Sequence, residues 1–169
     1  MRLIVTLSFI FILSFHFSKA QYVEIGYPIG LSETKGKINT GIGYIYHIRN
    51  FINFDFKGTY SIYEYSGYEL RNYCLTAGYV RYFRPFNLSK KTYRRMTAAV
   101  GYGMLDNSVL DKTNGINFHI SYTLMWDGKV SPMLTLSYDN YQYGKTTLDN
   151  QEFNAQMSFI SINIGFRFH

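Results

Sequence analysis

The stretch FISINIGFRFH, residues 159–169, alternates between two kinds of side chain. Ile160, Ile162, Ile164, Phe166 and Phe168 share one parity, whereas Ser161, Asn163, Gly165 and Arg167 share the other. Because successive side chains of a β-strand point to opposite faces, the stretch predicts a strand with one apolar face and one polar face. What each face contacts decides the fold.

The same alternation recurs along the chain after residue 20, and no helical periodicity competes with it. Earlier alternating segments begin near Val23, Ile38, Ile52, Tyr73, Met96, Phe118 and Val130. Most span about ten residues, so the pattern predicts an all-β fold of about eight strands. Within the closing segment the apolar parity reverses at Phe159, which predicts a β-bulge there.

Residues 1–20 have the features of a cleaved signal peptide. Arg2 precedes an apolar run of about 15 residues, and Ser18-Lys19-Ala20 resembles a small-x-small cleavage site. An uncleaved anchor helix is the alternative, although the run is shorter than the roughly 20 residues of a membrane span. We therefore expect an exported chain whose β-barrel domain covers residues 21–169.

Aromatic residues dominate the composition: 17 Tyr, 14 Phe and one Trp make up 19% of the chain, against 17% charged residues. The apolar faces are about five positions long, which matches the roughly 9–11 residues of a strand that crosses a bilayer. The polar faces carry Gly, Ser, Thr and Asn, which suit a narrow interior better than a solvated exterior. The sequence therefore favours a transmembrane barrel, with a secreted soluble barrel that binds a ligand as the alternative.

A transmembrane barrel must be closed, because unpaired strand edges in lipid leave backbone groups without hydrogen bonds. We therefore expect an up-and-down antiparallel barrel in which the first strand pairs with the last. The connections at 49–50 and 127–128 are tight, whereas those at 63–70, 106–115 and 142–151 are longer and polar. Short periplasmic turns and longer outer loops are typical of outer-membrane barrels, and the long basic connection at 84–95 is the exception here.

A barrel of about eight strands is filled by side chains, so we expect a packed polar interior and no channel for open diffusion. The residues expected in this lumen network are Glu24, Lys37, His47, Asp55, Lys57, Asp139 and Arg167. Glu24 and Arg167 fall at the same end of the first and last strands, so we expect them to pair. We expect no catalytic residue, metal or cofactor, and the single Cys, Cys74, excludes an intramolecular disulfide.

Basic residues gather around the connection at 84–95. Arg84, Lys90, Lys91, Arg94 and Arg95 form a candidate anion-binding cluster. Such a cluster suits the phosphates of lipid or of lipopolysaccharide. A solvated connection between strands is the alternative, and direct binding of nucleic acid is not expected.

The end of the chain resembles the terminal signal by which outer-membrane proteins are recognised for insertion. Ile164, Phe166 and Phe168 carry this resemblance, and His169 after the last aromatic is a small departure from it. The mature chain as a whole resembles the small eight-stranded barrels of the OmpA and OmpX type. This implies the outer membrane of a Gram-negative bacterium, contact with its lipid, its lipopolysaccharide and the barrel-insertion machinery, and a non-enzymatic structural or interaction role.

Two narrower resemblances leave alternatives open. Residues 75–79 (LTAGY), 82–83 (YF), 91–92 (KT) and 101–103 (GYG) resemble the TraO family of conjugative-transposon proteins. That resemblance implies a part in a DNA-transfer complex with other conjugation proteins. His119-Ile120-Ser121 resembles the His-x-Ser pair of outer-membrane lipid A deacylases, which implies an esterase. Tyr122 and Met133 depart from that family, which has Asn and a carboxylate at these places.

Overall fold

The computed structural model describes residues 21–31, 34–49, 52–65, 67–83, 92–106, 113–148 and 151–168. The predicted signal peptide and three members of the predicted basic cluster, Arg84, Lys90 and Lys91, lie outside the described residues. The described residues include no helix that is long and apolar enough to cross a membrane.

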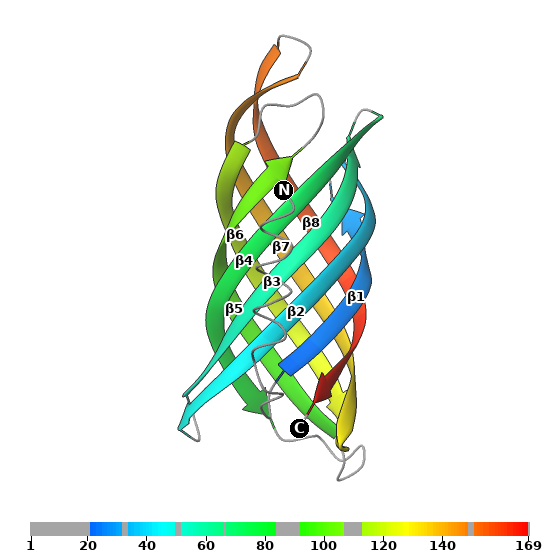
Figure 1. The fold of residues 1–169 in the computed structure, drawn as a ribbon, viewed down its shortest axis with the longest axis vertical. Coiled ribbons are helices and arrows are strands. Elements are labelled where there is room, and N and C mark those ends of the chain that lie inside the picture. The colour runs from blue at the N-terminus through cyan, green and yellow to red at the C-terminus, as the bar shows by residue number, and fades with distance from the viewer. Residues whose placement is uncertain are drawn as a thin grey trace, which may run out of the picture.

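Eight antiparallel strands form a closed barrel in which each strand pairs with its neighbours in sequence and β1 pairs with β8 (Figure 1). The strands are β1 (Gln21–Gly30), β2 (Lys35–Arg49), β3 (Ile52–Tyr65), β4 (Tyr68–Phe83), β5 (Thr92–Asp106), β6 (Thr113–Trp126), β7 (Val130–Leu148) and β8 (Gln151–Phe168). The predicted all-β, up-and-down closed barrel is confirmed.

The first and last strands meet along an unbroken register from Tyr22↔Arg167 to Gly30↔Phe159. Figure 1 shows this seam between β1 (blue) and β8 (red), with the start of β1 and the end of β8 at the same end of the barrel. We call that end the turn end, and the opposite end, where β7 joins β8, the loop end. Because β1 pairs with both β2 and β8, the barrel has no open seam between its first and last strands.

The outward face of the barrel is apolar and much of its lumen is polar, the inverse of a water-soluble barrel. Leu75 and Ile164 on the outward face are 73% and 62% exposed, whereas Ser161 and Asn163 on the inward face are 2% and 1% exposed. The pattern continues around the barrel, where outward Val, Ile, Leu, Tyr and Phe side chains form a belt across the strands. In the stretch 159–168, the Ile side therefore faces outward and the Ser, Asn, Gly and Arg side faces the lumen.

The predicted bulge at Phe159 is wrong. The register of β7 and β8 is continuous through Ser158, Phe159 and Ile160, and its irregularity lies between Gln142 and Lys145. Phe159 points into the barrel with Met157 and Ala155, and all three side chains are buried. The apolar parity reverses because the interior itself becomes apolar near the loop end.

The long connections predicted at 63–70 and 142–151 are mostly strand. Only residues 66–67 separate β3 from β4, and only residues 149–150 separate β7 from β8. Gly67 has a φ of 84°, the left-handed conformation that glycine adopts without strain and that a tight turn requires here. Beyond the apolar belt both faces of a hairpin can be polar, so alternation fades while the backbone ladder continues. Figure 1 shows the β7–β8 hairpin (orange) extending furthest at the loop end.

Candidate functional site

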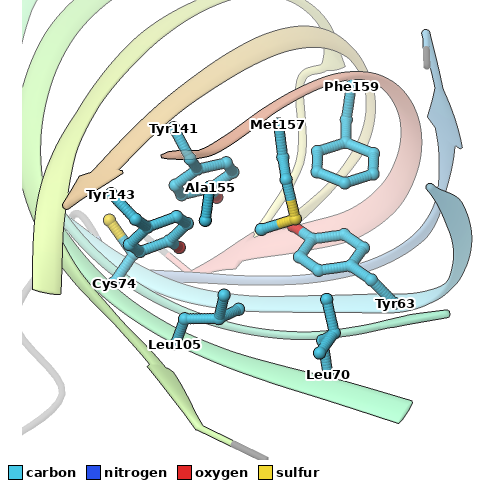
Figure 2. Packing of buried hydrophobic residues seen from close by; sticks show 9 residues of the cluster. All are labelled: Tyr63, Leu70, Cys74, Leu105, Tyr141, Tyr143, Ala155, Met157 and Phe159. Carbon is cyan, nitrogen blue, oxygen red and sulfur yellow. The ribbon is translucent and has the colours of Figure 1, made fainter. Parts of the chain in front are cut away.

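The side chains that fill the barrel form three layers along its axis. A small apolar cluster near the turn end contains Tyr22, Ile45, Met125 and Met133, with Tyr44 and Tyr82 packed against it. A polar layer occupies the middle of the lumen. A larger apolar cluster, which we call the loop-end cluster, contains Tyr63, Leu70, Cys74, Leu105, Tyr141, Tyr143, Ala155, Met157 and Phe159 (Figure 2). The candidate site is this packed interior.

Glu24 and Lys57 form a buried ion pair, with their side chains 2% and 4% exposed. The two residues come from β1 and β3, and Gly41 of β2 lies between them. A Cβ atom on Gly41 would lie 2.7 Å from Lys57 Cε and 3.0 Å from Glu24 Cγ. The missing side chain of Gly41 therefore leaves the space in which the two charges meet.

The predicted pairing of Glu24 with Arg167 is wrong. Arg167 donates instead to the Tyr82 hydroxyl at 3.1 Å and to Nε2 of His47 at 3.4 Å. It lies one inward position closer to the turn end than Gly165, the register partner of Glu24. Glu24 pairs with Lys57 because the long lysine side chain reaches it across Gly41.

Arg95 also lies in the lumen, fully buried, so its assignment to a surface anion-binding cluster is wrong. Its guanidinium carbon is 4.7 Å from the centroid of the Tyr22 ring, and its Nη2 donates to Thr123 Oγ1 at 3.4 Å. The Tyr22 hydroxyl is 2.8 Å from both carboxylate oxygens of Asp55. Arg95 has the inward parity of Thr97, so the alternation in the sequence contained the signal that places it inside.

A third group of polar side chains in the lumen is centred on Asp139, whose Oδ1 accepts two hydrogen bonds. His119 donates through Nδ1 to Asp139 Oδ1 at 2.8 Å, and Asn117 donates to the same oxygen at 3.1 Å. The carboxylate comes from β7, which places Asp139 directly beside His119 in the register. The His-x-Ser motif therefore has an acidic neighbour that its own spacing did not reveal. His119, Ser121 and Asp139 are nevertheless all buried on the inward face, away from the outward surface.

The remaining two residues of the predicted lumen network lie at opposite ends of β2. The prediction that Lys37 lies in the lumen is wrong. Its side chain is 47% exposed, and its Nζ lies 3.2 Å from Glu64 Oε2. A register shift between Gly36 and Ile38 turns Lys37 outward, which strict alternation cannot predict. His47 lies at the turn end, where its Nδ1 contacts Asn53 Oδ1 at 2.5 Å.

The lumen charges balance. Among the described buried side chains, the acids are Glu24, Asp55 and Asp139 and the bases are Lys57, Arg95 and Arg167, with His119 in addition. Buried charges are costly unless they are paired or hydrogen-bonded, so this equality favours a closed interior over an ion pathway. The described residues hold no group of three or more His, Cys, Asp or Glu side chains that could bind a metal ion.

The loop-end cluster covers the polar layer from above. The rings of Tyr63 and Phe159 stack with centroids 4.0 Å apart and planes 8° apart (Figure 2). Tyr141 stacks on Tyr143 in the same cluster, and the Tyr143 hydroxyl donates to Asn72 Oδ1 at 2.5 Å. The sequence prediction missed this cluster, although the parity reversal before Ile160 was its signal.

The residues of the predicted insertion signal lie on the outward face of β8. Ile164 and Phe166 are exposed, and Phe168 is half-buried at the turn end. Of the predicted basic cluster, Arg94 is the one described member that faces outward, where it is half-buried. Recognition of these residues by an insertion machinery or by lipid stays a prediction.

No protein-family model matches the chain, and no curated protein matches it in sequence. The resemblances to the TraO family and to lipid A deacylases therefore rest on the quoted motifs alone. Solved structures do match the fold. Neisserial surface protein A, NspA, aligns with a TM-score of 0.62 and 14% sequence identity over 88% of this chain and 96% of that chain.

Two further solved structures align over similar lengths. The outer membrane enzyme PagL aligns with a TM-score of 0.54 and 9% identity over 85% of this chain and 97% of that chain. The N-terminal β-barrel domain of Pseudomonas aeruginosa OprF aligns with a TM-score of 0.52 and 14% identity over 89% and 98%. At these identities the likeness concerns the fold, and the chain thus has the fold of small outer-membrane β-barrels.

Proposed function

We propose that this protein spans the outer membrane of a Gram-negative bacterium as a non-enzymatic barrel with a structural or interaction role in the cell envelope. One observation carries the proposal. The outward faces of the strands form an apolar belt, whereas the charged side chains on their inward faces are buried in the lumen. An exterior of this kind would be costly in water and is stabilised by acyl chains. Insertion machinery and lipopolysaccharide are the partners that such a location implies.

The packed interior supports a role other than transport. Apolar clusters lie near both ends of the lumen, and the polar layer between them is filled by paired charges and hydrogen-bonded side chains. With eight strands a barrel is only wide enough for its own side chains. We therefore expect no steady conductance in a planar bilayer.

The loop end is the part of the barrel that we propose for interaction with other molecules. The strands of the β3–β4 and β7–β8 hairpins continue past the apolar belt, and the β3–β4 hairpin carries the exposed charges of Glu69 and Arg71. Lys37 pairs there with Glu64 and Glu69, and Arg71 also pairs with Glu69. With the chain termini in the periplasm, this end faces outward from the cell.

Membrane fractionation tests the proposal. The protein should sediment with the outer membrane, resist extraction by alkaline carbonate, and migrate faster on a gel when it is not boiled, as closed barrels do. Sequencing of the purified protein should find Gln21 at its N-terminus if the segment 1–20 is cleaved. Recovery in the aqueous phase without detergent would contradict the proposal.

An esterase is the second candidate, because the His119–Asp139 hydrogen bond is the kind of contact that orients a catalytic histidine. Burial of His119, Ser121 and Asp139 inside the lumen opposes it, since a lipid ester would have to pass through packed side chains. Release of fatty acid from lipid A by the purified barrel, lost in Ser121→Ala, would establish the esterase. Membership of a DNA-transfer complex would require co-purification with other transfer proteins.

A further inference from the structure

A shallow groove lies on the outward surface of β4, β5 and β6 near the turn end. Phe83, Arg94, Met96 and Tyr122 line it, and its volume is about 190 Å³. Phe83 is the register partner of Arg94, and Met96 is the register partner of Tyr122, so three adjacent strands build the groove. Its floor is apolar, with one guanidinium at the edge nearest the turn end.

A second arginine flanks the same groove. Arg81 is the register partner of Met96 and lies with its guanidinium carbon 5.5 Å from the centroid of the Phe83 ring. Arg81 and Arg94 are therefore diagonal neighbours on adjacent strands, on either side of the pair formed by Phe83 and Met96. Side chains in this diagonal relation lie close enough to contact one small ligand group together.

The two arginines are charged side chains on a largely apolar part of the outward surface. The described outward side chains near the turn end of the other strands are neutral: Gln21, Tyr46, Ile52, Trp126, Val130 and Phe166. The exposed charges of Asp127 and Lys129 lie beyond the strands, in the turn between β6 and β7. On β4 and β5 the next outward residues toward the middle of the barrel are Tyr79 and Ala98, after which the apolar belt continues. Arg81 and Arg94 thus stand at the boundary between the belt and water, the level of lipid phosphates.

We infer that this groove binds an anionic phospholipid of the leaflet at the turn end. The guanidinium groups of Arg81 and Arg94 bind its phosphate, for which their planar donors are suited. The first part of an acyl chain lies over Phe83, Met96 and Tyr122. A zwitterionic headgroup fits less well, because its cationic amine would lie beside two arginines. The inference rests on the proposed location in a membrane.

Native mass spectrometry of the detergent-solubilised full barrel tests the site, with equimolar phosphatidylglycerol and phosphatidylcholine as probes. The wild-type barrel should retain phosphatidylglycerol preferentially. Arg94→Gln and Arg81→Gln should each weaken retention about tenfold, since each removes charge-assisted hydrogen bonds to the phosphate. Arg71→Gln is the matched control, because Arg71 is an exposed arginine at the loop end and pairs with Glu69. It should retain the lipid as the wild type does.

Two outcomes would overturn the site: equal retention of both lipids by the wild type, or unchanged retention by both groove variants. Purified lipopolysaccharide as a third probe tests the other source of a lipid phosphate. If the wild type retained lipopolysaccharide instead of phosphatidylglycerol, and the groove variants lost it, the phospholipid assignment would be overturned. Vesicle flotation and the heat-dependent gel shift of each variant establish separately that it inserts and folds. Failure to insert into any vesicle would count against the membrane location, whereas insertion without lipid preference would count against the groove alone.

Discussion

Replacing Lys57 by Met should destabilise the barrel strongly. Met has a similar length and volume, so the lumen remains filled, but Glu24 loses its partner. The side chains of Glu24 and Lys57 are each at most 4% exposed, so water cannot replace the lost ammonium group. Breaking a buried ion pair by removing one partner costs about 3–5 kcal/mol. Lys57 also interacts electrostatically with Asp139 and Asp55, so the substitution leaves three lumen acids with two lumen bases.

Urea unfolding of the barrel in lipid vesicles measures this effect, with the fluorescence of the single Trp, Trp126, and the heat-dependent gel shift as independent signals. Lys57→Met should lower the free energy of unfolding by about 3–5 kcal/mol, and the double variant Glu24→Gln/Lys57→Met should recover most of the loss. Lys37→Met is the control, because its exposed pair should contribute about 1 kcal/mol or less. A Lys57→Met barrel that unfolds at the same urea concentration as Lys37→Met would refute the reasoning.

Three further predictions test other parts of the barrel. Gly41→Val should destabilise it by about 1–3 kcal/mol, because the new side chain would overlap Lys57; urea unfolding measures the loss, and an unchanged midpoint would contradict the proposed space. Phe159→Ala should cost about 3–5 kcal/mol by removing the ring stacked on Tyr63, and together with Tyr63→Ala it should allow brief conductance events in a planar bilayer that the wild type lacks. Leu75→Arg should cost about 2–4 kcal/mol in vesicles if Leu75 lies near the bilayer midplane, and an equal stability in vesicles and in lipid-free solution would argue against an embedded exterior.

Strand alternation by itself determined the architecture of this protein. A period of two residues places every second side chain on one face, so apolar strings such as Ile160 to Phe168 identified the strands. The Gly, Ser, Thr and Asn content of the opposite faces indicated that the polar side lies inside. These properties are local, and the confirmed closed barrel and its inverted polarity follow from them.

The partners inside the lumen were decided by the tertiary structure. Parity placed Glu24, Lys57 and Arg167 on the inward face, but the register of three strands and the gap at Gly41 selected Lys57 as the partner of Glu24. A register shift between Gly36 and Ile38 turns Lys37 outward, and a strict period of two residues cannot predict such a shift.

The loop-end cluster shows the same limit. Alternation shows where the polarity pattern reverses along a strand. It does not show whether the lumen is polar or apolar at that height of the barrel. Phe159 and Met157 are buried because strands far apart in the sequence bring Tyr63, Leu105 and Tyr141 to the same level of the lumen. Which side chains lie at the same level depends on the stagger of the strands around the closed barrel. The stagger is a property of the whole sheet and not of any one strand.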